Sequence, residues 1–101
     1  MNTTDYPGAR HLLGSYLHQD FAEEFPSAMA AVETFATKEP RATVESAVQD
    51  FAQLSAEEAF IDSPESKLFE LGCFYDPRSE GLTPAEWIHC VRNVLLARLG
   101  R

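Results

Sequence analysis

Two side chains suited to proton transfer, His18 and Asp20, stand two positions apart in the segment Tyr16–Phe21. Histidine titrates near neutral pH and a carboxylate can orient it, so general acid–base catalysis is one interpretation. On a continuous helix this spacing turns the two side chains apart, and no serine or cysteine in a nucleophile motif accompanies them. We therefore favour a structural interpretation, in which His18 is partly buried and hydrogen-bonded across helices while Gln19 and Asp20 cap backbone groups. A contact with a partner protein is the second alternative for His18.

A metal site could in principle use His18, Cys73, His89 and Cys90. Zinc sites normally have paired ligands on one element, such as C-x2-C or H-x3-H, and neither pattern occurs in the sequence. On a helix the adjacent His89 and Cys90 would point about 100° apart. The segment 72–77 also lacks the spacing of a phosphate-binding loop. We expect no metal and no cofactor.

The charge of the chain is acidic and unevenly distributed. Residues 1–82 carry 15 acidic and 5 basic side chains, whereas residues 83–101 carry 1 acidic and 3 basic ones. Phosphate contacts require lysine and arginine, so this balance argues against direct binding to nucleic acid. It fits an acidic cytoplasmic protein, or a protein whose partner is basic.

Apolar residues recur at intervals of three and four along most of the chain, which is the pattern of amphipathic helices. Prolines and N-cap residues separate these segments. No run of alternating apolar and polar residues predicts a strand. The predicted helices cover residues 9 to about 18–20, 28–39, 41–54, 56–61, 64–71 and 84–99, with a loop over residues 73–82.

Helix-capping signals support these boundaries. The segment Thr83–Glu86 combines a capping box with a proline in the first turn and is the strongest cap in the sequence. Ser55 with Glu58 three residues later also has the capping-box spacing. Ser27 and Ser63 are suitable N-caps, and Gly72 suits the left-handed position after a helix end.

The fold class predicted from these patterns is all-α: a compact single domain of five to six short helices with a long apolar C-terminal helix. The 101 residues suffice for one core. Residues 1–6 are expected to be a loose N-terminus, with a turn at residues 6–8. No segment has the composition of a signal peptide or the roughly 20 apolar residues of a membrane span. Without an export signal, we expect Cys73 and Cys90 to be reduced.

Two further stretches stand out, residues 72–77 and the start of the last helix. Asp76 before Pro77 is typical of a turn, and Tyr75 is expected to bury its ring with the hydroxyl hydrogen-bonded. Trp87 begins the apolar face of the last helix. We interpret it as a core anchor.

The three stretches together resemble a known family, the small helical immunity proteins of bacterial contact-dependent growth inhibition systems. The matching residues are Tyr16-Leu17-His18-Gln19-Asp20-Phe21, then Gly72-Cys73-Phe74-Tyr75-Asp76-Pro77, then Gly81 through Glu86-Trp87. Their order and spacing agree from about residue 12 to residue 99. The family usually has an aromatic residue where Leu17 stands and often a tyrosine at Phe74.

The resemblance implies a binding protein without activity of its own. Such proteins stay in the cytoplasm of the producing cell and block the C-terminal toxin domain that a sibling cell delivers. The toxins are commonly nucleases, whose active-site clefts are basic because they hold phosphate. An acidic inhibitor complements such a cleft, and the partner expected here is a cognate toxin domain.

The resemblance separates scaffold from contact surface, because toxins differ between strains and their contacts should vary with them. We therefore expect the shared residues to maintain the fold: Tyr16, His18, Gln19, Asp20, Gly72, Tyr75, Asp76, Pro77 and Trp87. From charge density alone, we predict that exposed acids bind the toxin: Glu57, Glu58, Asp62, Glu65 and Glu80. The alternative function is a small acidic helical adaptor or regulatory domain that binds another bacterial protein.

Overall fold

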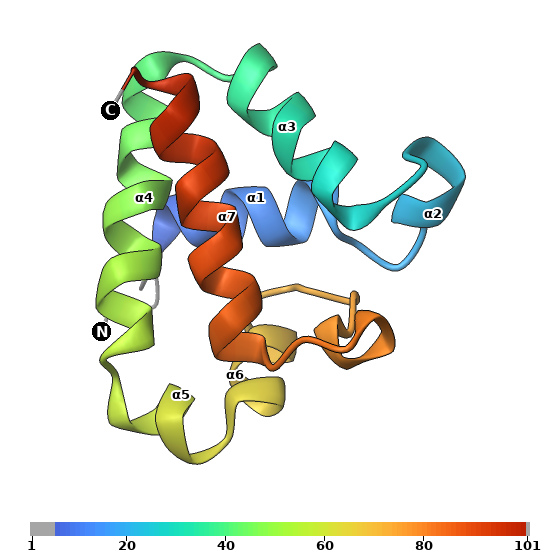
Figure 1. The fold of residues 1–101 in the computed structure, drawn as a ribbon, viewed down its shortest axis with the longest axis vertical. Coiled ribbons are helices and arrows are strands. Elements are labelled where there is room, and N and C mark those ends of the chain that lie inside the picture. Colours follow the sequence, from blue (N-terminus) through green and yellow to red (C-terminus); the bar gives the residue numbers. More distant parts are fainter. Residues whose placement is uncertain (1–5, 101) are drawn as a thin grey trace.

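The computed structural model describes residues 6–100, and within this range it contains α-helices, one short 3-10 helix and no strand. The prediction of an all-α fold is confirmed. The elements, shown in Figure 1, are α1 (Pro7–Tyr16), α2 (Phe21–Glu24), α3 (Ala28–Lys38), α4 (Arg41–Ser55), α5 (Glu58–Asp62), α6 (Pro64–Glu70), η1 (Pro77–Glu80) and α7 (Pro84–Arg98).

Two of these elements were not predicted. The four-residue helix α2 is too short to show periodicity, and its Phe21 is only partly buried against the core. Element η1 lies inside the predicted loop 73–82, where Asp76 caps it by accepting a hydrogen bond from the Arg78 N–H. The described residues therefore contain seven α-helices rather than five or six.

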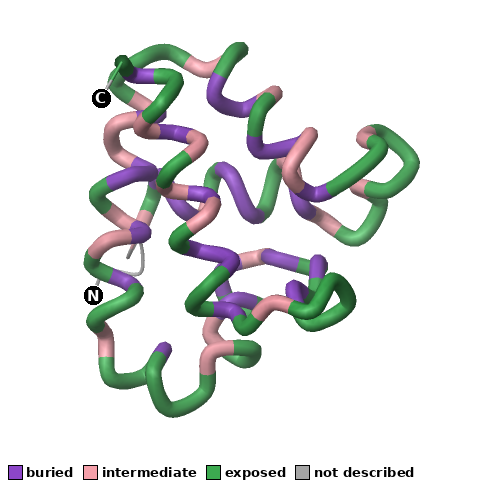
Figure 2. The backbone as a smooth tube through the Cα atoms, viewed as in Figure 1, coloured by how far each residue is buried: buried purple, intermediate pink, exposed green. Residues whose placement is uncertain are grey.

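The core lies where α1, α3, α4 and α7 pack together, with α1 crossing behind the antiparallel pair α4 and α7 (Figure 1). Figure 2 shows the buried residues on the inward sides of these helices. The buried apolar residues form one cluster, whose largest fully buried members are Trp87, Phe35, Phe51, Phe60, Leu12, Leu13, Leu17, Leu54, Ile88 and Leu95. The prediction that the last helix is the long apolar one stays a prediction, since α7 has 15 residues, as α4 does.

Helix α1 is attached to α4 through its first turn. The backbone N–H groups of Gly8 and Ala9 donate to one carboxylate oxygen of Asp50, at 2.6 and 3.1 Å. Asp50 lies on α4, so a side chain from another helix satisfies donors that are unpaired at a helix start. The predicted turn at residues 6–8 is wrong, because Pro7 is the first helical residue. Residues 1–5 of the predicted loose N-terminus lie outside the described range, whereas Tyr6 is half-buried.

The predicted caps have mixed outcomes. Ser27 accepts a hydrogen bond from the Ala30 N–H, and both bonds of the capping box between Thr83 and Glu86 are present. The predicted box between Ser55 and Glu58 is wrong: Ser55 ends α4, and its hydroxyl donates to the Ala52 carbonyl. Helix α5 starts later, without a side-chain cap. None of the helices in residues 6–100 is long and apolar enough to cross a membrane.

The two capping boxes, one formed and one only apparent in the sequence, give a matched test. Thr83→Ala removes an acceptor that the Glu86 N–H needs, and should lower the free energy of unfolding by about 1 kcal/mol. Ser55→Ala, at an exposed helix end, should change it by less than about 0.5 kcal/mol. Urea unfolding followed by circular dichroism measures both. Equal effects of the two substitutions would contradict the assignment of the caps.

Candidate functional site

The three stretches noted in the sequence meet in space. The Phe74 N–H donates to the carbonyl of Leu17 at 2.9 Å, which joins residues 72–77 to the end of α1. The Tyr75 ring lies edge-on to Phe21 at 5.8 Å and tilted against Trp87 at 5.4 Å. These contacts link α2, the segment after α6, and α7 at one junction.

Gly72 is required at this junction for two reasons. Its φ of 104° lies in the left-handed region, as predicted for the residue after a helix end. A Cβ at this position would also stand 3.0 Å from the Cα of Gly14 in α1. A side chain at residue 72 would therefore strain the backbone and push α1 away.

His18 and Asp20 are not arranged for acid–base catalysis. The His18 Nδ1 accepts a hydrogen bond from the Asp20 N–H at 3.0 Å, so the imidazole bonds to backbone rather than to the carboxylate. The His18 Nε2 stands 3.5 Å from Glu24 on α2, whereas Asp20 and Gln19 are exposed. Asp20 precedes α2 as its N-cap residue, but its side chain makes no capping hydrogen bond. The expected capping by Asp20 is therefore wrong.

Tyr16 belongs to a polar cluster that the sequence did not predict. Its hydroxyl donates to a carboxylate oxygen of Glu39 at 2.8 Å, and the His11 Nε2 lies 3.2 Å from the same oxygen. Burial, and then the Glu39 carboxylate, raises the pKa of Tyr16 to about 12. The hydrogen bonds from Tyr16 and then from His11 lower the pKa of the Glu39 carboxyl. This cluster joins α1 to the C-terminal end of α3.

The Tyr75 hydroxyl differs from that of Tyr16. Its ring is buried as expected, but among the described residues no side chain makes a hydrogen bond of standard geometry to its buried oxygen. Burial, followed by the nearby Glu80 carboxylate, raises the pKa of Tyr75 to about 12. Neighbouring Cys73 is also buried, and burial raises the pKa of its thiol to about 11, so the thiol stays protonated at neutral pH.

The five predicted contact acids lie on or next to α5, α6 and η1, in the lower half of the molecule in Figure 1. Glu57 is half-buried and held by the Tyr6 hydroxyl at 2.8 Å and by the Lys67 ammonium at 3.2 Å. Glu65 pairs with Arg78 at 3.7 Å. The other three, Glu58, Asp62 and Glu80, are exposed, and within residues 6–100 none of them forms a salt bridge.

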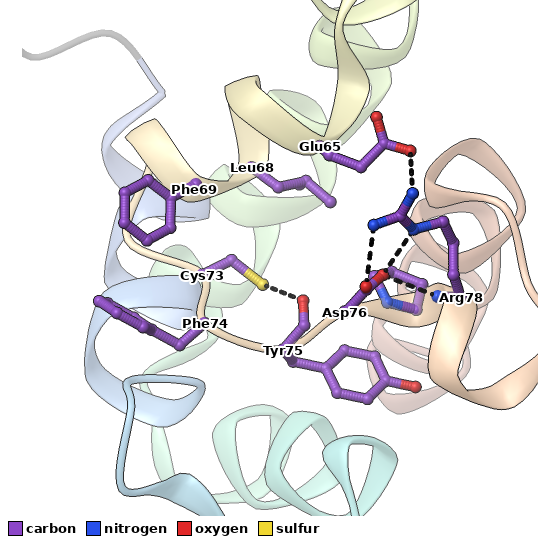
Figure 3. Close-up of a pocket in the computed structure, with 9 residues that line it drawn as sticks. Glu65, Leu68, Phe69, Cys73, Phe74, Tyr75, Asp76 and Arg78 are labelled. Atoms are coloured by element: carbon purple, nitrogen blue, oxygen red, sulfur yellow. Dashed lines mark hydrogen bonds and ion pairs between the residues drawn. The ribbon is translucent and has the colours of Figure 1, made fainter.

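A hollow of about 210 Å³ opens beside these acids, between α6 and the segment 73–78. Figure 3 shows Phe69 and Phe74 side by side at one edge of it, and Glu65, Asp76 and Arg78 at the opposite edge. Both phenylalanines are exposed. Neither was predicted to be a contact residue, although Phe74 lies in the stretch 72–77 that carries the family resemblance. Phe69 directly follows Leu68, and because Leu68 is buried, Phe69 lies off the buried side of α6.

The described residues contain no group of three or more histidine, cysteine, aspartate and glutamate side chains that could hold a metal ion. The four residues considered from the sequence are spread over the end of α1, the segment after α6, and α7.

The sequence matches the family described as CdiI immunity protein over residues 5–95. The chain belongs to this family. Comparisons with curated proteins and with solved structures found no match. A CdiI immunity protein inhibits a toxin of contact-dependent growth inhibition and is not an enzyme. The match confirms the family resemblance seen in the sequence. It favours an immunity function over the adaptor and catalytic interpretations.

In this CdiI immunity protein, the two tyrosines test whether the junction is held as described. Tyr16→Phe removes the hydrogen bond to Glu39 and should cost about 1 kcal/mol of unfolding free energy at pH 7. Tyr75→Phe removes a buried hydroxyl that makes no hydrogen bond of standard geometry within the described residues, and it should change stability by less than about 0.5 kcal/mol. Urea unfolding of both variants measures the difference, and a larger loss for Tyr75→Phe would contradict it.

The Tyr16 effect should depend on pH. The pKa of Glu39 is lower in the folded chain than in the unfolded chain, so the carboxylate's contribution is complete above the unfolded value of about 4.3. It is lost as the pH falls through the lowered folded pKa. The difference between wild type and Tyr16→Phe should therefore shrink at acid pH, and a constant difference would show that Glu39 is not the acceptor.

Proposed function

We propose that this CdiI immunity protein neutralises its toxin by binding the toxin's C-terminal domain with its acidic end, the surface formed by residues 57–80 on α5, α6 and η1. The observation that carries the proposal is the charge of this segment, which holds seven acidic and two basic side chains. Both basic residues already form ion pairs inside the segment, Lys67 with Glu57 and Glu70, and Arg78 with Asp76 and Glu65. The net negative charge of the segment is therefore available to attract a basic partner protein.

The partner we propose is a toxin domain with a basic active-site cleft, as a nuclease requires for phosphate binding. Opposite charge accelerates the encounter of two proteins, and carboxylates can take positions that a nuclease offers to phosphates. Neutralisation would occur in the cytoplasm of the producing cell, without contact between the immunity protein and nucleic acid or membrane.

Among the acids, Glu58 and Asp62 are the best candidates for this steering. Both are exposed on α5 and neither has a salt-bridge partner within the described part of the chain. Glu65 and Glu80 add to the field from α6 and η1. Glu57, held by Tyr6 and Lys67, contributes charge while also fixing the start of α5.

Charge reversal tests the proposal. The double variant Glu58→Lys with Asp62→Lys should slow association with the toxin domain about tenfold at low salt and flatten its salt dependence, because steering depends on this charge. Stopped-flow or surface plasmon resonance measures both quantities.

The matched control reverses two exposed acids elsewhere, Glu23 on α2 and Glu33 on α3, which changes the net charge equally. Helix α3 lies at the end of the molecule opposite α5 (Figure 1). The control should associate at nearly the wild-type rate. Equal slowing of both variants would show that net charge rather than the acidic end steers the toxin, and unchanged kinetics in the first variant would contradict the proposal.

A further inference from the structure

We infer that Phe69 and Phe74, with the hollow beside them, form the apolar centre of the toxin contact and receive one apolar side chain from an otherwise basic toxin surface. The inference rests on the proposed function and assigns to the acidic end the residues that hold the complex together. Charge would bring the partners together, and this aromatic pair would keep them bound.

The first observation is where the protein exposes apolar surface. Among residues 6–100, the large hydrophobic side chains that are exposed are Ile61, Phe69 and Phe74, at 61%, 62% and 49%. All three fall between α5 and the segment after α6, so the exposed apolar side chains lie on the acidic end. Clustered exposed aromatic residues with a polar surround are typical of protein contact sites, because burying them on binding is favourable.

The second observation is the geometry of the pair. The rings of Phe69 and Phe74 meet edge-to-face with centroids 5.1 Å apart, and both line the hollow together with buried Leu68, Cys73 and Tyr75 (Figure 3). A hollow of about 210 Å³ is smaller than the roughly 300–1,000 Å³ of sites for small-molecule ligands. It suits a single side chain of a partner.

The backbone that carries the pair is fixed before binding. The N–H groups of Gly72 and Cys73 donate to carbonyls of α6 at 2.9 and 3.0 Å, and the Phe74 N–H donates to Leu17 of the scaffold. A surface that is already ordered loses little conformational entropy on binding. These bonds involve backbone atoms only, so truncating the two phenylalanine side chains leaves them in place.

The charges around the pair select the partner. Glu65 and Asp76 flank the hollow and share Arg78, while Glu70 lies next to Phe69 in sequence on α6. A second copy of the protein docking here would bring two acidic ends together, which like-charge repulsion opposes. A basic toxin surface would instead gain favourable contacts at the rim, so the occupant is the toxin domain.

The test is the double variant Phe69→Ala with Phe74→Ala, measured against the cognate toxin domain by surface plasmon resonance. Loss of a central aromatic pair should raise the Kd by at least about thirtyfold, mainly through faster dissociation. The association rate should stay near wild type, in contrast to the reversal of Glu58 and Asp62. Ile61→Ala, equally exposed but outside the hollow, should change the Kd less than about fivefold.

The outcomes separate this inference from the function on which it rests. If wild type binds the toxin and the double variant dissociates at the same rate as wild type, the aromatic pair is not the centre of the contact. The proposal that the acidic end binds the toxin is then unaffected. If wild type does not bind the toxin at all, both the proposed function and the inference about the aromatic pair are wrong. If sedimentation shows a dimer of the free protein that the double variant abolishes, the surface belongs to a second copy and the inference is overturned.

Discussion

Gly8→Ala should lower the free energy of unfolding by about 3 kcal/mol, the largest effect expected from adding one methyl group to this protein. A Cβ at Gly8 would stand 2.5 Å from the backbone nitrogen of Ala47 and 2.7 Å from the carbonyl carbon of Ser46, both in α4. Backbone atoms cannot rotate away, so α1 would have to move. Movement would also pull the Gly8 and Ala9 N–H groups from the Asp50 carboxylate. The helix propensity of alanine offsets only about 1 kcal/mol.

Gly14→Ala is the matched control, because it adds the same methyl group to the same helix. Beyond the neighbouring residues and backbone of α1 itself, no described atom lies within 4 Å of a Cβ at Gly14, so alanine should be neutral or stabilising by up to about 1 kcal/mol. Chemical denaturation at fixed pH compares the two variants directly. Similar stabilities would mean that α1 does not cross α4 at Gly8.

Trp87→Ala should lower the free energy of unfolding by about 4 kcal/mol, because it removes the largest side chain of the core and leaves a cavity. Trp87 is 1% exposed and packs against Tyr75, which in turn contacts Phe21. Its loss should therefore loosen the junction between α7, the segment after α6, and α2. Thermal unfolding measures the effect. A loss below about 1 kcal/mol would show that Trp87 is not the anchor of this core.

Trp87→Ala also tests whether Trp87 maintains the fold or contacts the toxin. Trp87 is not on the surface, but it packs against Tyr75, which lines the hollow. Below its melting temperature, folded Trp87→Ala should therefore weaken toxin binding only through the loosened segment after α6, and by less than truncation of Phe69 and Phe74. Phe69→Ala provides the converse, since an exposed side chain should cost about 1 kcal/mol of stability at most while affinity for the toxin falls. A Trp87 variant that is stable but does not bind would place this residue in the contact.

The fold was predictable wherever the signal was local. The spacing of apolar residues and the caps at Ser27 and Thr83 placed the longer helices within a few residues of their observed bounds. Ser55 and Glu58 show the limit of local reasoning: a capping box needs both bonds, and here the preceding helix continues through Ser55. The attachment of Asp50 to the start of α1 joins positions about forty residues apart, which no local pattern encodes.

The site was predictable in part. The sequence singled out the stretches 16–21 and 72–77 and Trp87, but it did not predict that they lie together. The acids selected by charge density lie on neighbouring elements. Glu57 already forms an ion pair with Lys67. Such pairing depends on how α5 is arranged against α6, which the sequence does not show. The exposure of Phe69 depends on which side of the seven-residue helix α6 faces the core. A helix of two turns whose large apolar residues are the adjacent Leu68 and Phe69 does not show from sequence which of the two is buried.

The most direct test of toxin neutralisation is a titration of the cognate toxin's C-terminal domain with this protein, followed by calorimetry and by the toxin's own activity. We expect a saturable complex that weakens with added salt, and loss of toxin activity in proportion to the complex formed. A toxin that stays fully active in excess immunity protein, with no heat of binding, would contradict the proposed function.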